Sequence, residues 1–133
     1  MSKKIIFLEF NEITQEIIDQ MIGENELPNF KKLMAKSYQF KTLTDAEGEF
    51  LEPWIQWFSI HTGISYNTHK VFRLTEGTEK DSPTIFDILI DSGRKVGSIS
   101  SMNLKAFSSP GSFYMPDPWC IKQPCYPKDL QPA

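Results

Sequence analysis

The sequence predicts an α/β fold, a three-layer sandwich in which a mostly parallel sheet lies between helices. Short apolar stretches, typical of buried strands, alternate along the chain with amphipathic stretches typical of helices. The 133 residues are 40% hydrophobic and 23% charged, the balance of a globular protein with a hydrophobic core.

Three strands are expected. The first covers residues 4–9, where four consecutive apolar residues precede Glu9. Such an uninterrupted run predicts a strand with both faces buried, as in a parallel sheet. Residues 38–43 alternate apolar and polar side chains, which indicates one buried face. Residues 95–100 form the third predicted strand.

Helical spacing of apolar residues predicts helices between these strands. They are expected over residues 12–22, 28–36, 53–61 and 83–92. Capping and helix-starting residues define their ends, with proline in the first turn and glycine after the last. These residues are Asn11 and Gly23, Pro28, Pro53 and Gly63, and Ser82 and Gly93. Residues 64–80 are expected to be mostly loop.

Two parts are expected, an α/β domain over residues 1–107 and an irregular, proline-rich tail over residues 108–133. Six prolines in the tail oppose long regular structure. Three strands make a small sheet. The chain is therefore predicted to be the N-terminal part of a longer fold, or a naturally shortened relative of one.

The charge and the cysteines exclude several classes of protein. A net charge of −3 and an isoelectric point near 5.4 argue against binding to nucleic acid or to an anionic membrane. No apolar run is long enough for a membrane span or a signal-peptide core, so a cytoplasmic protein is expected. Cys120 and Cys125 lack the spacing of a zinc site. Two free thiols are expected, with a disulfide as the alternative.

A set of motifs is similar to one known family. Residues 57–63 read W-x-S-x-x-T-G, and His69 follows six residues later. With the strand ending at Glu9 and the Leu-Pro-Asn-Phe turn at residues 27–30, this order resembles the alkaline phosphatase superfamily, above all its phosphodiesterase-like members. The resemblance covers roughly residues 4–104. It implies an alkaline-phosphatase-like fold, a divalent zinc or manganese cofactor, and hydrolysis of phosphate or related esters.

The resemblance also implies metal ligands, and here the chain departs from the family. Glu9 stands where the family has a metal-binding aspartate, and Phe10 replaces a small residue. Glu9 would bind a metal through its carboxylate, or else cap the next helix or pair with a lysine. Asn11 would add an amide oxygen ligand or serve only as the helix cap.

The nucleophile position differs more. Counting back nine residues from Thr62, as the family spacing requires, leads to Pro53, which has no nucleophilic group. One inserted residue would place Glu52 there, as a metal ligand or general base. The alternative is that Glu52 is an acidic residue favoured by the helix dipole.

Several further residues have two interpretations each. Trp54 either packs in the core or stacks on a sugar or base. Asn103, at the end of the third predicted strand, is a candidate substrate contact. His69 is expected to fix its loop or to contact the substrate. His61 is expected to be a buried, hydrogen-bonded histidine rather than a ligand, and Asp117 a turn former rather than a site residue.

Two functions follow. The first is the N-terminal part of a metal-dependent hydrolase that acts on a small phosphate ester or sugar phosphate; further ligands would come from downstream, so this chain alone would be nearly inactive. The alternative is a non-catalytic module of that fold, binding a phosphate or sugar ligand or a partner chain. The missing hydroxyl at Pro53 favours the alternative. An open sheet edge would also favour a homo-oligomer or a missing C-terminal part.

Overall fold

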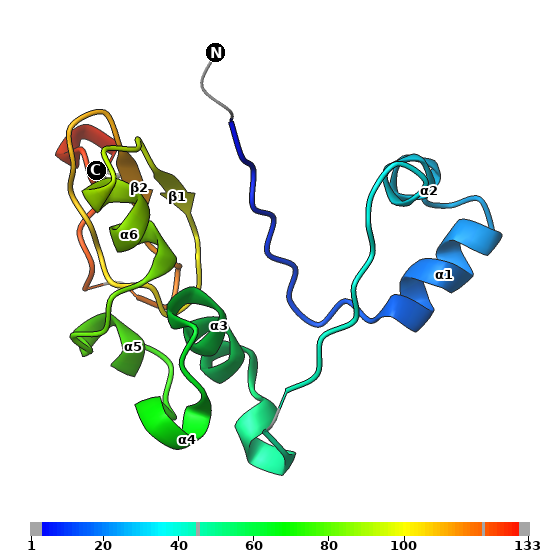
Figure 1. The fold of residues 1–133 in the computed structure, drawn as a ribbon, viewed down its shortest axis with the longest axis horizontal. Coiled ribbons are helices and arrows are strands. Elements are labelled where there is room, and N and C mark those ends of the chain that lie inside the picture. The colour runs from blue at the N-terminus through cyan, green and yellow to red at the C-terminus, as the bar shows by residue number, and fades with distance from the viewer. Residues whose placement is uncertain (1–3, 45, 121, 131–133) are drawn as a thin grey trace. The chain divides into compact units, whose positions relative to one another are not determined.

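The computed structural model describes residues 4–44, 46–120 and 122–130. The chain divides into two compact units, an N-terminal unit (Met1–Thr44) and a C-terminal unit (Asp45–Ala133). Figure 1 shows helices in both units and a small parallel sheet in the C-terminal unit, which places the protein in the α/β class. The division between the units falls between Thr44 and Asp45 along the chain.

The N-terminal unit contains helices α1 (Gln15–Gly23) and α2 (Pro28–Met34), which pack against each other. Both were predicted, and Pro28 begins α2 as expected. The cap of α1 was not Asn11: the Thr14 hydroxyl accepts a hydrogen bond from the Ile17 amide at 3.4 Å. Since Glu12 has a φ of +54°, the helix cannot begin until after this residue.

The two strands predicted in this unit are wrong. Residues 4–9 and 38–43 have no regular secondary structure, and none of the described residues of the unit is buried. Ile5, for example, is 85% exposed. An apolar run becomes a strand only when a neighbouring strand accepts and donates its main-chain hydrogen bonds. The sequence pattern supplies the side chains for a strand but not that neighbour.

The C-terminal unit begins with helical segments, of which α3 is the longest. The proline and glycine that were predicted to bound α3 do so: Pro53 is its first residue, and Gly63 follows it with a left-handed φ of +69°. Two short helices lie where mostly loop was expected. The segments are η1 (Gly48–Leu51), α3 (Pro53–Thr62), α4 (Tyr66–His69) and α5 (Glu76–Glu79).

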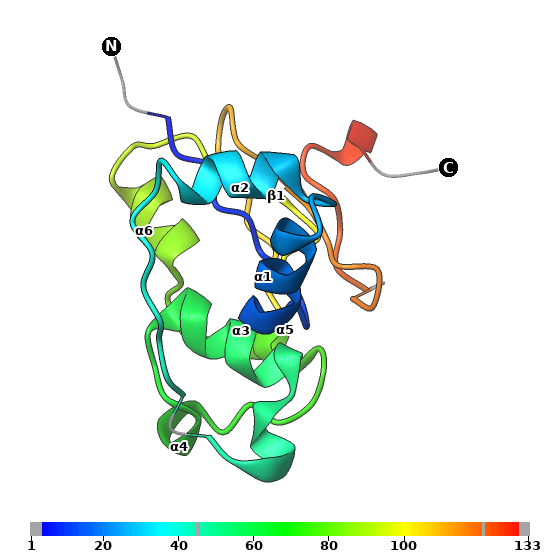
Figure 2. The same ribbon diagram turned by 90° about the vertical axis from the view of Figure 1, so that its right-hand side faces the viewer.

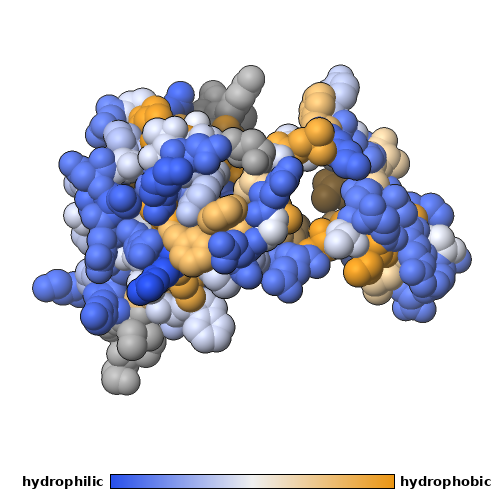
Figure 3. Space-filling model, turned by 90° about the horizontal axis from the view of Figure 1, so that it is seen from below, coloured by the Kyte–Doolittle hydropathy of each residue, from blue (hydrophilic) through white to orange (hydrophobic). Residues whose placement is uncertain are grey.

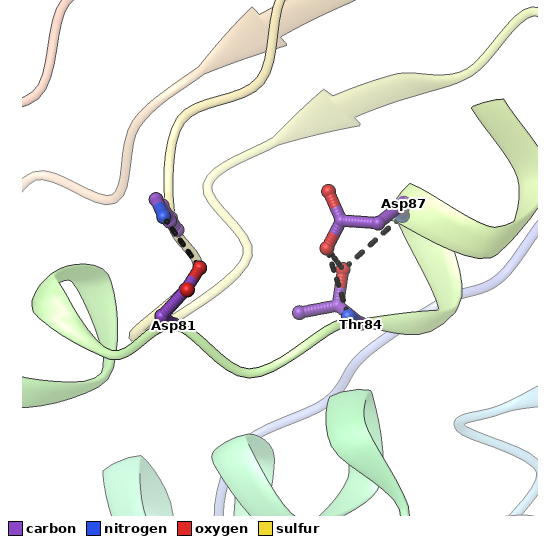
Figure 4. Close-up of polar contacts among 4 residues, drawn as sticks. Asp81, Thr84 and Asp87 are labelled. Atoms are coloured by element: carbon purple, nitrogen blue, oxygen red, sulfur yellow. Dashed lines mark hydrogen bonds and ion pairs between the residues drawn. The ribbon is translucent and has the colours of Figure 1, made fainter. Parts of the chain in front are cut away.

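Helix α6 (Ile85–Asp91) follows, and Thr84 caps it instead of the expected Ser82. The Thr84 hydroxyl accepts a hydrogen bond from the Asp87 amide at 3.3 Å, and the Asp87 carboxylate accepts one from the Thr84 amide at 2.8 Å (Figure 4). This reciprocal pair is a capping box. Gly93, with a φ of +77°, ends the helical segment as predicted.

The sheet pairs β1 (Gly97–Ile99) in parallel with β2 (Phe113–Met115), with Ser98 opposite Tyr114. Strand β1 is the centre of the strand predicted over residues 95–100. Strand β2 comes from the proline-rich segment, which is therefore part of this unit. Tyr114 also forms an antiparallel bridge with Tyr126 through two main-chain hydrogen bonds of 2.7 and 2.8 Å. The short helix η2 (Lys128–Leu130) follows.

The core of this unit lies on one face of the sheet. Its buried members are Phe86 of α6 and Val96, Leu104 and Tyr114. Figures 1 and 2 show α3 between α6 and α4, and α3 contacts both helices. On the opposite face of the sheet, Ile99 and Phe113 are exposed. The described part of this unit thus has helices on one face of the sheet, and hydrophobic residues reach the surface of both units (Figure 3).

Candidate functional site

Helix α3 carries two of the predicted site residues at its first turn. Glu52 precedes Pro53, is exposed, and makes no side-chain hydrogen bond to cap the helix. Its main-chain carbonyl accepts hydrogen bonds from the amides of Ile55 (3.0 Å) and Gln56 (3.2 Å). Since proline has no N–H, the Trp54 amide is the first-turn donor that these bonds leave for a ligand.

Asn103 holds α3 in place. Its amide nitrogen donates to the Trp54 carbonyl at 3.0 Å, and its amide oxygen accepts from the Gly77 N–H at 2.9 Å. The residue is 1% exposed and has a φ of +59°, which asparagine tolerates better than most residues. The side chain predicted to contact a substrate is therefore engaged with the main chain of α3 and α5. Because the residue is buried, a substrate could reach it only if the residues around it moved.

Gly77 permits this arrangement because it has no side chain. A Cβ atom at Gly77 would lie 2.5 Å from the Phe58 ring, 2.7 Å from the main-chain oxygen of Asn103 and 2.8 Å from its side chain. Real Cβ atoms do not approach other atoms so closely. Helix α5 therefore reaches Asn103 only with glycine at position 77.

Trp54 is also fixed from its side chain. The indole Nε1–H donates to the Phe72 carbonyl at 2.8 Å, and the residue is half-buried. This bond determines the orientation of the ring, while part of its surface stays accessible. The structure thus brings Trp54 and Asn103 into direct contact, next to Glu52 in the chain.

His69 lies against the same helix and fixes its loop. Its Nδ1 accepts a hydrogen bond from the Val71 amide at 2.9 Å, so the proton of a neutral ring is on Nε2. Nε2 lies 2.9 Å from the Ser59 hydroxyl oxygen and therefore donates to it. The Ser59 hydroxyl in turn donates to the Ile55 carbonyl at 3.3 Å. In this tautomer His69 cannot accept the serine proton, so the pair is not an activated nucleophile.

Glu9 and Asn11 belong to the N-terminal unit. Glu9 is half-buried and Asn11 is exposed, and neither follows a strand. Their expected proximity to Glu52 stays a prediction. Within the described residues, no group of three or more His, Cys, Asp or Glu side chains is placed to hold a metal ion. A metal centre of the expected kind would need ligands beyond those that the described part of the chain brings together.

Two cavities lie in the C-terminal unit, away from the predicted site residues. A cavity of about 370 Å³ borders α6 and is lined by Asp87, Phe107 and the ion pair between Lys105 and Asp81. This ion pair joins Nζ and Oδ1 at 3.6 Å and appears in Figure 4 beside the capping box. A smaller one, about 130 Å³, is lined by residues that include Trp119 and Cys120.

The sequence did not predict the burial of Asp117. One carboxylate oxygen accepts a hydrogen bond from the Trp119 amide at 2.8 Å, which makes the expected turn. The other oxygen is buried without a hydrogen-bond partner, and the residue is 2% exposed. Burial raises the pKa of the Asp117 carboxyl above its ordinary value, and the Trp119 hydrogen bond offsets only part of this effect. A proline-flanked aspartate gives no sequence signal for such burial.

The neighbours of Asp117 are buried too. Burial raises the pKa of the Cys120 thiol, and the nearby Asp117 charge adds to the effect. Burial likewise raises the pKa of Tyr114, to which Cys120, Asp117 and Cys125 contribute in that order. The Tyr114 hydroxyl donates to the Leu104 carbonyl at 2.8 Å. Cys120 and Cys125 are free cysteines in the structure.

The chain matches no protein-family model, no curated protein and no solved structure in the three comparisons. Every helix in the described residues falls short of the length and hydropathy that crossing a membrane requires. Function must therefore be inferred from the residues themselves.

Proposed function

We propose that the chain is the N-terminal part of a metal-dependent hydrolase of phosphate or related esters, similar to phosphodiesterases. The observation that supports the proposal most is the start of α3. There the exposed Glu52 carboxylate adjoins a helix N-terminus whose Trp54 amide is left as a donor. The positive end of a helix attracts a phosphate group. Glu52 would repel the same anion, and a divalent cation between them would remove that repulsion.

The roles of the residues follow from this chemistry. Glu52 would bind the cation or act as a general base, and Trp54 would contact the ester through its amide and the accessible part of its ring. Glu9 and Asn11 are proposed as further oxygen ligands, and zinc or manganese as the metal. Asn103 and His69 would act indirectly, because their hydrogen bonds hold α3 and its loop in place.

The finer architecture is part of the same proposal. Ile99 and Phe113 are exposed on one face of the sheet, and the apolar segment 4–9 has the composition of a buried strand. Both features support a larger three-layer sandwich in the complete protein, where such surfaces are covered. We also propose a cytoplasmic location. Either a second copy of this chain, in a homo-oligomer, or a further C-terminal part would cover the exposed surfaces.

The proposal is tested by calorimetric titration of the chain with manganese and with zinc. We expect weak binding that Glu52→Gln reduces and that Glu49→Gln, a change of a nearby exposed acid, leaves intact. Turnover of an aryl phosphodiester should be close to the rate without protein. Absence of metal uptake would contradict the metal-dependent function. Strong turnover that Glu9→Ala abolishes would contradict the incomplete site.

A non-catalytic binding module is the second candidate. The observation in its favour is that Pro53 occupies the expected nucleophile position, while Ser59 receives a hydrogen bond from His69 rather than giving it a proton. Titration with inorganic phosphate and a sugar phosphate, without metal, distinguishes this candidate. Saturable binding that Glu52→Gln strengthens would support it, because removal of the carboxylate lessens repulsion of the anion.

A further inference from the structure

A tight turn over residues 116–120 carries a buried acid. The Trp119 amide donates to one Asp117 carboxylate oxygen, and the Cys120 amide donates to the Asp117 carbonyl, both at 2.8 Å. The second carboxylate oxygen has no hydrogen-bond partner although the residue is 98% buried. A buried carboxylate with one hydrogen bond lacks most of the stabilisation that water would give it.

The groups that face Asp117 do not supply that stabilisation. Tyr114 on β2 and the Cys120 thiol interact electrostatically with Asp117, and the Cys125 thiol interacts with Tyr114. None of the three bears a positive charge in any protonation state. Lys122 and Glu79 line the small cavity beside Cys120, but neither contributes to the shifted pKa of Asp117. The buried charge therefore has no compensating cation in the described part of the chain.

We propose that residues 116–120 form a proton-dependent latch, which stays closed while the Asp117 carboxyl carries a proton and opens when that proton is lost to solvent. In the closed state the carboxyl is neutral, and its burial costs less than the burial of a charge. In the open state water hydrates the carboxylate, which removes the cost of the buried charge.

Opening has two consequences for the C-terminal unit. It exposes Cys120, which is 3% exposed in the closed state and lines the small cavity together with Trp119. It also separates Cys120 from the main chain of Asn103, whose proximity partly offsets the raised pKa of the Cys120 thiol. Because Asn103 joins α3 to α5, the latch is connected to the residues around Trp54.

The direction of the pH dependence follows from the raised pKa of Asp117. An aspartate in an unfolded chain has a pKa of about 3.9. The closed state is therefore most stable below about pH 4 and loses stability as the pH rises through the pKa of the buried carboxyl. Above that pKa the free-energy difference between the closed and the open state no longer changes with pH.

The test measures alkylation of Cys120 between about pH 4 and pH 8. Tryptic peptides resolve the two cysteines by mass, because Lys122 lies between them. Dividing the rate in the native chain by the rate in the denatured chain at each pH removes the intrinsic ionisation of the thiol. We expect the protection of Cys120 to fall as the pH rises from the pKa of the unfolded carboxyl to that of the native carboxyl. The total fall should be about tenfold for each unit by which the native pKa exceeds the unfolded one.

Asp117→Asn should give protection that no longer changes with pH, while Asp91→Asn, which alters an exposed acid, should keep the wild-type profile. A wild-type protection without pH dependence would overturn the latch, as would an unchanged profile in Asp117→Asn. If that variant does not fold, the carbon-13 resonance of the Asp117 carboxyl in the wild-type chain decides. Its titration must coincide with the loss of Cys120 protection, and two separate midpoints would overturn the proposal.

Discussion

Both units of this protein contain helices, but the units differ in what holds them together. In the N-terminal unit, α1 and α2 have the predicted apolar spacing, yet none of the described residues of this unit is buried. In the C-terminal unit, Leu104 and Tyr114 are almost fully buried. There Asn103 bonds to Trp54 and Gly77, which lie 49 and 26 positions before it in the chain. Local pattern is sufficient for a helix, whereas a core requires contacts between distant segments.

The difference can be measured separately in each unit. All three tryptophans, at positions 54, 57 and 119, belong to the C-terminal unit. Their fluorescence therefore reports the unfolding of that unit alone, while far-ultraviolet circular dichroism reports the helices of both.

The largest effect is expected from the core. Leu104→Ala should lower the free energy of unfolding by about 2–5 kcal/mol, because the change removes buried methyl groups and leaves a cavity. Denaturant titration followed by tryptophan fluorescence measures this loss. Ile17→Ala, at a half-exposed position of α1, should change the free energy of unfolding of the N-terminal unit, followed by circular dichroism, by less than about 0.5 kcal/mol. Equal losses would show that the contrast between the units is wrong.

A smaller loss is expected from Asn103→Ala, about 2–4 kcal/mol by the same measurement. It leaves the Gly77 N–H and the Trp54 carbonyl without their partners. Asn25→Ala is the matched control, since Asn25 has nearly the same φ (+62° against +59°) but is exposed in the N-terminal unit. Its cost, followed by circular dichroism because Asn25 lies outside the tryptophan-containing unit, should be limited to backbone strain of about 1 kcal/mol. An Asn103→Ala variant as stable as the wild type would contradict the bridging role.

Glycine substitutions should have opposite signs in the two units. Gly77→Ala should destabilise the C-terminal unit by about 1–3 kcal/mol, because its Cβ would overlap Phe58 and the main chain of Asn103. Gly23→Ala, at the end of α1 with open space around it, should raise helicity and stabilise α1 by up to about 1 kcal/mol. Fluorescence measures the first and circular dichroism the second; the same sign for both would refute the comparison.

The smallest effect is a pH dependence at Glu76. Hydrogen bonds from the amides of Arg73 (3.0 Å) and Phe72 (2.9 Å) hold the pKa of its carboxyl below the ordinary value. The ionised form is thus favoured in the folded state. Its stabilisation is present above the unfolded pKa of about 4.3 and is lost as the pH falls through the folded value.

Fluorescence-monitored unfolding from about pH 6 to pH 3 measures this dependence. Glu76→Gln should make the acid-side decline in stability shallower. Glu16→Gln, in the first turn of α1, should leave the decline seen by tryptophan unchanged. An identical decline in Glu76→Gln and the wild type would rule out this role of the two amides.

Prediction from sequence was accurate where the relevant interactions are local. Pro53 and Gly63 bound α3 because each imposes a backbone dihedral or removes a donor by itself. The cap of α6 was predicted two residues early, since Ser82 and Thr84 are both good caps and only Thr84 has an aspartate three residues on. Strand assignments failed at residues 4–9 and 38–43, where a pattern of side chains cannot specify a pairing partner.

The candidate site shows the same division. Glu52 could be placed at the head of a helix from the sequence. The hydrogen bonds of Asn103 could not, because they depend on Trp54 and Gly77 arriving at the same point from other parts of the chain. The tautomer of His69 likewise depends on the Val71 amide that faces its Nδ1.

By itself, the sequence determined the four longer helices α1, α2, α3 and α6, but not the short helices α4 and α5. It also determined where prolines and glycines bound the longer helices, and which carboxylate stands at the start of α3. Tertiary structure alone decided which apolar run became a strand, which asparagine was buried, and that Asp117 lost its contact with water. The physical reason is the distance along the chain over which each interaction acts. Dihedral preferences and caps act within about four residues, whereas burial and strand pairing depend on segments that only the folded chain brings together.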